Sequence, residues 1–301
     1  RPGDRRGGMR TCYLILLAVL CASCGPQDDG PPPDPIVVYA PDSQKESLPA
    51  LFAEFTADTG IHVAAKWGPS AGITDGVINK TGIPADILLT DNVADIWRAA
   101  DEGALRPIDA ESVAKVASSV RDSDGFWVSR NVYAAVLVTQ PLEGRNVGER
   151  VESIIEQFDF CVLTSHHPLS RSYIVNSIQD LGVKTAERGI RRMVAALERE
   201  PYASEEELLD AVRVGECNAA MVANATADSA LQVHEVDLGA ATIDAVGIGR
   251  HARSADSAQR FVAWLISERP VEVPATLTTP VSVAGFRDEE ARLLAERAGY
   301  H

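Results

Sequence analysis

An alternation of strand-like and helix-like segments, which begins at Ile36, limits the fold of this chain more than any other feature of its sequence. Residues 36–40 are β-branched and apolar, residues 43–59 carry apolar side chains at helical spacing up to Gly60, and residues 62–67 predict a second strand. The same order continues with a helix over 70–79, a strand over 85–91 and a helix that Asp91 or Asn92 caps. This order predicts a parallel sheet with helices on both faces.

The middle of the chain departs from this pattern and divides the chain in two. Two strand-like runs, residues 126–129 and 132–140, follow each other without a helix between them, and a second strand–helix series starts at Phe158. We therefore expect an α/β fold of two lobes, with two parallel-rich sheets flanked by helices, a two-strand hinge and a ligand cleft between the lobes. The expected boundaries are 36–133 with 241–285 for lobe I, and 134–240 for lobe II, on which the helix of 286–301 packs.

The first part of the chain has the pattern of an export signal followed by a tether. Residues 1–23 combine a basic start with an apolar run that is too short for a bilayer core, which needs about 20 residues. The run ends Leu-Cys-Ala-Ser-Cys at Cys24, which resembles a bacterial lipobox and predicts a lipidated periplasmic or cell-surface protein; an ordinary cleaved signal is the alternative. The proline-rich residues 24–35 predict a stiff spacer. Met9 is an alternative start, which would place residues 1–8 outside the protein.

Charge and composition exclude several classes of protein. The chain has 43 acidic and 28 basic residues, and its formal net charge of −15 disfavours binding to the phosphate backbone of nucleic acids. Its hydrophobic fraction of 46% is that of a globular protein rather than a disordered chain. Of the five cysteines, Cys161 and Cys217 lie beyond the export segment and form either one disulfide or two buried thiols.

Five segments make the chain similar to the type II solute-binding proteins of ABC importers, most closely to their ferric-ion-binding branch. The most specific segment runs PADILLTDNVADIWRAADEGALRPI over 84–108, and the others are 36–46, 59–72, 214–226 and 247–268. The resemblance implies a hinged protein, expected to be a monomer, that captures a solute and passes it to a membrane permease without catalysing a reaction. A lipoprotein that kept the fold as a sensor or scaffold is an alternative, and a neighbouring permease gene would separate the two.

The resemblance also implies a binding site that differs from that of the iron-binding branch. The two adjacent tyrosines of that branch fall on Ala225 and Thr226 here, and the histidine of its first loop falls on Ser43 or Gln44. None of these side chains is a phenol or an imidazole, so we expect no metal site of that kind and no cofactor. Iron held by other carboxylates, by water or by an anion remains the alternative.

Loops between a strand and the start of a helix are expected to bind the ligand, because backbone N–H groups and hydroxyls can face it there. Arg171 would add a positive charge that suits a carboxylate or a phosphate. We therefore expect a small anion, an anion-bearing organic solute or a metal chelate, although helix capping alone also explains each loop serine and aspartate. The candidate ligand-binding residues are Asp42, Ser43, Gly68, Ser70, Ala71, Asp91, Asn92, Tyr133, Ser170, Arg171, Ser172, Asn224 and Thr226.

Two other signals compete with this interpretation. Residues 68–72, Gly-Pro-Ser-Ala-Gly, match the G-x-S-x-G elbow of α/β-hydrolases and make Ser70 the nucleophile of an alternative serine hydrolase. The match lacks the preceding strands and the His-Gly-Gly segment typical of that fold. His166 and His167 are adjacent, and neighbouring loop histidines seldom converge on one ion, so we expect no metal there.

Overall fold

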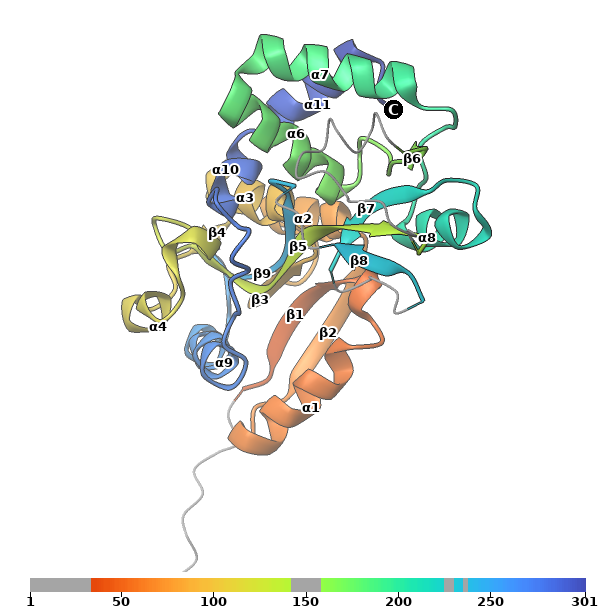
Figure 1. Cartoon of the computed structure of the whole chain (residues 1–301). Helices are drawn as coiled ribbons and strands as arrows, with labels where there is room; N and C mark the ends of the chain where they lie inside the picture. Colours follow the sequence, from red (N-terminus) through yellow and green to blue (C-terminus); the bar gives the residue numbers. More distant parts are fainter. Residues whose placement is uncertain (1–33, 142–157, 225–229, 235–237) are drawn as a thin grey trace, which may run out of the picture. The chain divides into compact units, whose positions relative to one another are not determined.

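The computed structural model describes four stretches of the chain, and all structural statements below concern them (Figure 1). They lie within one compact unit, Asp34–His301. In these stretches no helix combines the length and the apolar character that crossing a membrane requires. Cys24 and Thr226, together with the predicted signal, lie outside the described residues. The described stretches are 34–141, 158–224, 230–234 and 238–301.

The first half of the fold follows the predicted alternation closely. The first helix starts later than predicted, at Leu48, because Pro49 lacks a backbone N–H and suits the first turn of a helix. It ends at Gly60, whose φ of 72° is a left-handed conformation that glycine adopts without strain. The elements are β1 Ile36–Pro41, η1 Asp42–Gln44, α1 Leu48–Thr59, β2 Val63–Gly68, α2 Ser70–Ile78, β3 Ile87–Thr90, α3 Val93–Asp101, β4 Leu105–Arg106, α4 Ala110–Ala114 and η2 Ser118–Val120.

The second half is a further series of strands and helices, as predicted, with two changes among the strands. The runs at 126–129 and 132–140 form a single strand, β5, with a register shift between Ser129 and Asn131. The strand predicted from Phe158 is reduced to two residues in β6. The elements are β5 Trp127–Thr139, β6 Phe160–Cys161, α6 Pro168–Leu181, α7 Val183–Ala196, α8 Glu205–Val214, β7 Ala219–Ala223, β8 Gln232–His234, β9 Ala241–Gly249, α9 Ala255–Glu268, α10 Val281–Phe286 and α11 Asp288–Ala298.

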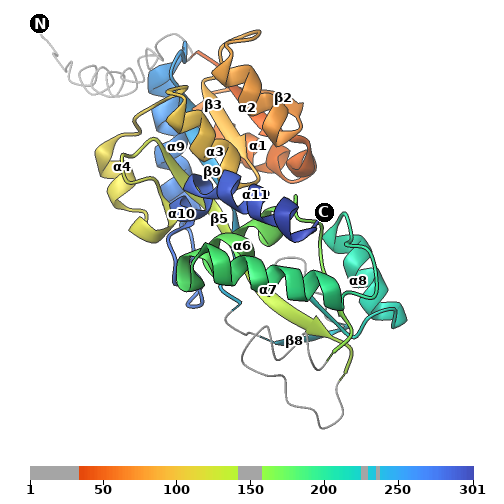
Figure 2. The ribbon, with the colours of Figure 1, turned by 90° about the horizontal axis from the view of Figure 1, so that it is seen from above.

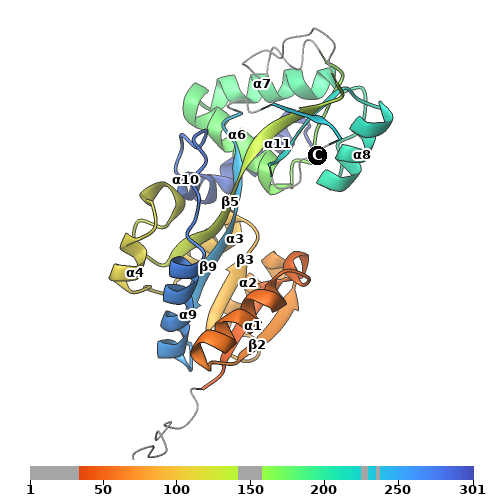
Figure 3. The same cartoon turned by 60° about the horizontal axis from the view of Figure 1, so that its bottom comes forward.

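The strands form one mixed sheet in the order β2-β1-β3-β9-β5-β7-β6, with β4 on β9 and β8 on β5. β1 is parallel to β2 and β3, and β6 is parallel to β7, whereas β5 and β9 are antiparallel to their neighbours. The sheet is therefore less parallel than predicted, because β5 and β9 at its centre run antiparallel to every strand with which they pair. Figure 3 shows β5 and β9 running side by side from one group of helices to the other.

Two hydrophobic clusters fill this α/β fold, one on each half of β5. The first cluster contains β1 to β4, most of β9, and α1 and α9, and its centre includes an edge-to-face contact of Phe55 and Phe261 at 4.9 Å. The second cluster contains β6, β7 and the helices α6, α7, α8 and α11, and Figure 2 shows α6, α7 and α11 packed side by side. On β5 the first cluster ends at Val132 and the second begins at Ala135. The predicted lobe boundaries stay predictions about which segments move together.

A disulfide lies inside the second cluster. It joins Cys161 at the end of β6 to Cys217 just before β7, with a Cα–Cα distance of 6.0 Å. Both cysteines are buried. Of the two alternatives, one disulfide or two buried thiols, the structure has the disulfide. It links the neighbouring parallel strands β6 and β7.

Candidate functional site

Four of the predicted ligand-binding residues meet at one edge of the sheet. β1 is parallel to β2 and β3, so the carboxyl ends of all three strands lie at this edge. Ser43 Oγ donates to Asp91 Oδ2 at 2.6 Å, and Asn92 Nδ2 lies 3.1 Å from Asp91 Oδ1 and 3.4 Å from Ser70 Oγ. We call Ser43, Ser70, Asp91 and Asn92 the strand-end cluster.

Helix capping explains part of this cluster. Asn92 Oδ1 accepts a hydrogen bond from the backbone N–H of Asp95 at 2.9 Å and so caps α3, as its place before the helix predicts. Its Nδ2 is then left to contact Asp91, Ser70 and the carboxylate of Asp95, 2.8 Å away. The carboxylate of Asp91 is therefore oriented by two donors, and it is only partly buried, so it still has lone pairs available for a ligand.

Three further predicted residues flank the strand-end cluster and contribute less. Asp42 is exposed at the start of η1, and Ala71 is exposed in the first turn of α2. Gly68 ends β2, where a Cβ would lie 2.9 Å from Ile73 Cγ2, so a larger residue would disturb the start of α2. Its role is to allow close packing.

A second polar group surrounds the carboxylate of Asp244 on β9. Gln44 Nε2 donates to Asp244 Oδ1 at 2.6 Å, and Oδ2 accepts from Arg130 at 2.8 Å, Asn131 at 2.6 Å and Tyr133 at 2.9 Å. Arg130 also donates to Gln44 Oε1 at 2.7 Å. We call these five residues the Asp244 hub. It connects the loop after β1 to both β5 and β9, the strands that join the two clusters.

Tyr133 belongs to this hub rather than being free to bind a ligand. Burial, the negative charge of Asp244 and the hydrogen bond to it raise the pKa of Tyr133 to about 12. The phenol is therefore protonated at neutral pH and donates to Asp244. It provides no phenolate of the kind that binds ferric ion.

The imidazole of His167, for which no ligand role was predicted from the sequence, is influenced by the charge of Asp91. His167 precedes α6, and its Nδ1 accepts from the backbone N–H of Leu169 at 3.2 Å, while its Nε2 lies 3.9 Å from Glu205 Oε1. Burial lowers the pKa of His167, and the negative charges of Glu205 and then Asp91 act against that shift. Because the carboxylate of Asp91 acts on His167, the site draws residues from the segments of both clusters.

The residues predicted at the start of α6 do not reach this site. Ser170 is buried, and its hydroxyl accepts from Tyr300 Oη at 3.1 Å. Arg171 donates to the carbonyl of Ser165 at 2.8 Å and to that of Asp288 at 2.8 Å, and it pairs with the Asp288 carboxylate at 3.4 Å. Ser172 Oγ accepts from the backbone N–H of Ala241 at 3.0 Å. The hydrogen-bond partners of these three side chains lie in the loop before α6, on β9, at the start of α11 and just after α11.

These positions change the expected electrostatics of the site. Arg171 does not supply the positive charge predicted for the site, because its guanidinium pairs with Asp288 at the start of α11. The charges that act on His167 are carboxylates, so the described part of the site is acidic and rich in oxygen atoms. In the described residues, no three histidine, cysteine, aspartate or glutamate side chains come together in a way that could hold a metal ion.

Asn224, another predicted residue, lies at a different place. It lines a pocket of about 310 Å³ between the middle of β5 and residues 272–276. Its backbone N–H donates to the carbonyl of Ala134 at 2.9 Å, which fixes the end of β7 beside β5.

The fold and the oxygen-rich site, drawn from two α/β clusters joined by paired strands, define a solute-binding protein. The chain belongs to the family described as bacterial extracellular solute-binding protein, whose pattern it matches over residues 36–273. Members of this family bind solutes for ABC importers, so the predicted transport function is confirmed and the serine hydrolase is not supported. The protein is an exported one, as predicted.

Comparisons with individual proteins agree with this assignment. Iron uptake protein A1 of Synechocystis is 24% identical over 296 residues, which cover 86% of this chain and 80% of that protein. The structure of a Trichodesmium protein, IdiA or FutA, in complex with iron and citrate matches with a TM-score of 0.74 at 19% identity, covering 88% of this chain and 99% of that one. AfuA of Actinobacillus pleuropneumoniae with bound fructose 6-phosphate matches with a TM-score of 0.67 at 11% identity, over 89% and 98% of the two chains. The two structural matches show the fold.

Proposed function

We propose that this protein captures ferric iron as a chelate with a small organic carboxylate and delivers it to an ABC permease. The observation that carries the proposal is the strand-end cluster, in which Ser43 Oγ donates to the carboxylate of Asp91 at 2.6 Å and the amide of Asn92 lies 3.1 Å from it. The charge of Asp91 also acts on His167, whose pKa burial lowers, so that a neutral imidazole from the second half of the fold is available to the same ligand. Carboxylate oxygen and neutral imidazole are both ligands of iron. The iron in the names of two proteins similar to this chain supports the same choice.

A chelate fits the site better than a bare ion. The described residues offer too few converging donors to surround a metal, and the adjacent tyrosines of the iron-binding branch are replaced at 225 and 226. A chelate brings most of its own ligands and needs only one or two from the protein. The hydroxyls of Ser43 and Ser70 and the amide of Asn92 can then hydrogen-bond to the carboxylates of the chelator.

Capture would proceed by closure about β5 and β9. Ligand contacts to Asp91 on one side and His167 on the other stabilise the closed state relative to the open one. The Asp244 hub links Gln44, next to the strand-end cluster, to both hinge strands, so it can transmit a change at the cluster to the hinge. We also propose that Cys24 carries the lipid that holds the protein at the membrane; the mass of the N-terminal peptide of the exported protein tests this.

The change Asp91→Asn tests the proposed ligand directly. It removes the charge but keeps the shape, so the affinity for ferric citrate is expected to fall by about 10- to 100-fold, the cost of losing one charged ligand or its orienting partner. Isothermal titration calorimetry of the purified protein with ferric citrate measures the effect, and citrate alone and fructose 6-phosphate serve as competing candidates.

Asp101→Asn is the matched control, because it makes the same charge change at an exposed position at the end of α3. Its affinity for ferric citrate is expected to stay within about twofold of that of the unchanged protein. Binding of ferric citrate that is equally strong in the Asp91 and Asp101 variants would contradict the proposal. Binding of fructose 6-phosphate instead would replace the chelate by an anion-bearing organic solute.

A further inference from the structure

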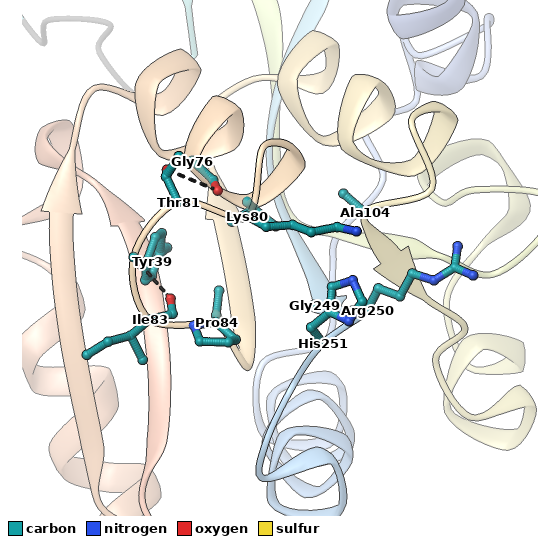
Figure 4. Close-up of a pocket in the computed structure, with 13 residues that line it drawn as sticks. Tyr39, Gly76, Lys80, Thr81, Ile83, Pro84, Ala104, Gly249, Arg250 and His251 are labelled. Carbon is teal, nitrogen blue, oxygen red and sulfur yellow. Dashed lines mark hydrogen bonds between the residues drawn. The ribbon is translucent and has the colours of Figure 1, made fainter.

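A second pocket lies at the opposite edge of the same sheet from the strand-end cluster. It has a volume of about 320 Å³ and is formed by the end of α2, the loop 80–85, Ala104 and residues 249–251 (Figure 4). Ala85 precedes β3 and Gly249 ends the antiparallel β9, so the pocket is at the amino end of β3, whereas Asp91 follows its carboxyl end. The pocket is therefore separate from the solute site.

The interior of this pocket is apolar. Tyr39, Ala85 and Ala104 are buried in its walls, Val77 and Pro84 are partly buried, and Ile83 is 45% exposed at its mouth. An exposed isoleucine beside an open apolar space leaves hydrophobic area that a ligand can cover.

The rim of the pocket is basic, in contrast to the acidic chain as a whole. Lys80, Arg250 and His251 line it and are exposed, and in the described part of the chain none of them takes part in an ion pair. The guanidinium of Arg250 extends away from the pocket and donates to the carbonyl of Gly103 at 3.2 Å, so Lys80 is the cation directed at the pocket (Figure 4). Figure 4 shows the side chains of Lys80 and His251 extending toward each other across the pocket. Lys66 is not a lining residue, but its Nζ lies 5.4 Å from the centre of the ring of Tyr39, which is one.

The loop that carries Lys80 is held in a conformation that lysine disfavours. Lys80 has a φ of 57°, the one positive value found at a non-glycine residue in the described stretches. Asparagine or glycine would adopt this conformation at a lower cost. Strained residues of this kind are frequent at functional sites. The loop is fixed by hydrogen bonds from Tyr39 Oη to the carbonyl of Ile83 at 2.7 Å and from the backbone N–H of Thr81 to Gly76 at 2.9 Å, so the pocket is preformed.

We propose that this pocket binds an amphipathic anion, with a phosphate or carboxylate group at the basic rim and an apolar chain or ring inside. The inference does not depend on which solute the strand-end cluster takes. An anion without an apolar part would leave the interior unfilled, and a neutral apolar compound would leave the cations unused, so both parts of the ligand are needed for tight binding.

The ligand can come from solution or from a membrane. A free amphipathic anion and the head group of an anionic lipid offer the same chemistry to this pocket. The experiment therefore has one arm with free compounds and one with vesicles.

The test uses the full chain and octyl phosphate as the free probe, with inorganic phosphate and octanol as its two halves. Calorimetry is expected to show binding of octyl phosphate at least 10-fold tighter than that of either half. In the second arm, sedimentation with phosphatidylglycerol vesicles is compared with sedimentation with phosphatidylcholine vesicles, and preference for the anionic lipid is expected if the source is a membrane.

Two variants locate the binding. Lys80→Asn removes a rim charge and suits the positive φ, so it is expected to weaken binding about fivefold, about 1 kcal/mol, without lowering the melting temperature. Ala104→Leu fills the interior and is expected to weaken binding at least 10-fold. Lys184→Asn, the same change at an exposed site on α7, is the control and is expected to leave binding unchanged.

Each result of these binding experiments either supports the proposed site or overturns it. Binding in either arm that both pocket variants weaken and the control does not supports the proposal, and the arm identifies the source. Absence of binding in both arms overturns it, as does binding that Lys80→Asn and Ala104→Leu leave intact. Ferric citrate titrations of the same Lys80→Asn protein show whether the solute site is unaffected, so failure here is distinguishable from failure of the proposed function.

Discussion

Replacement of Asp244 by alanine is expected to lower the free energy of unfolding by about 3–5 kcal/mol, because it leaves a buried guanidinium without its counter-ion. Asp244 is 6% exposed, and the side chain of Arg130 is 12% exposed. The Nε of Arg130 already has no hydrogen-bond partner, so this side chain depends on Asp244 and Gln44. The amides of Gln44 and Asn131 and the hydroxyl of Tyr133 would also lose an acceptor.

Urea denaturation measures this change, and Asp75→Ala is the control. Asp75 pairs with Arg98, but both side chains are well exposed, at 55% and 39%, so its loss is expected to cost less than about 1 kcal/mol. If Asp244→Ala and Asp75→Ala destabilise the protein equally, the hub does not hold the hinge strands together. A stability loss accompanied by weaker ferric citrate binding in the folded variant would show that the hub also positions the loop after β1.

Loss of the disulfide is the second large effect. The double change Cys161→Ala with Cys217→Ala is expected to lower the free energy of unfolding by about 2–4 kcal/mol. The bridge spans a sequence separation of 56 residues, and closing a loop of that length removes about 4 kcal/mol of chain entropy from the unfolded state. Thermal and urea unfolding of the two proteins measure the difference.

The single variants provide the control for this prediction. Either cysteine change alone breaks the same bond, so each is expected to cost nearly as much as the double change, and the sum of the two should greatly exceed it. Additive effects would mean that packing of the two side chains, rather than the bridge, carries the stability. Because both sulfur atoms are buried, dithiothreitol is expected to reduce the bridge only when the protein unfolds.

Much of the fold could be predicted because its signals are local. The spacing of apolar residues predicts α1, and Gly60 and Asn92 mark helix ends by their own conformation and hydrogen bonding. The direction of β5 and β9 could not be predicted in this way. An apolar run predicts a strand but does not indicate which other strand it pairs with or in which direction. β5 and β9 pair although they are far apart in sequence.

Only those site residues could be predicted whose position follows directly from the order of the parallel strands. Ser43, Ser70, Asp91 and Asn92 each follow a strand of one parallel set, so they had to share an edge. Arg171 follows a strand in the same manner, yet its partner on α11 is 117 positions away and no local pattern reveals it.

The missed residues lacked a local signal of function. His167 has the sequence context of an ordinary helix cap, and capping is one of its roles. Asp244 lies in an otherwise apolar strand, and its partners Gln44 and Tyr133 are 200 and 111 positions distant. The one indication in the sequence was that Asp244 is a charged residue within a strand expected to be buried, where a carboxylate requires hydrogen-bond or ion-pair partners.

The shared strand β5 has a consequence for the way the protein is made. Both clusters are built on β5, and its partners β7 and β9 come about a hundred positions later in the sequence. A nascent chain can therefore complete neither core until most of it has been synthesised, and pairing over such separations makes folding slow. For an exported protein this delay is useful, since a chain whose cores are still open can cross the membrane before it folds.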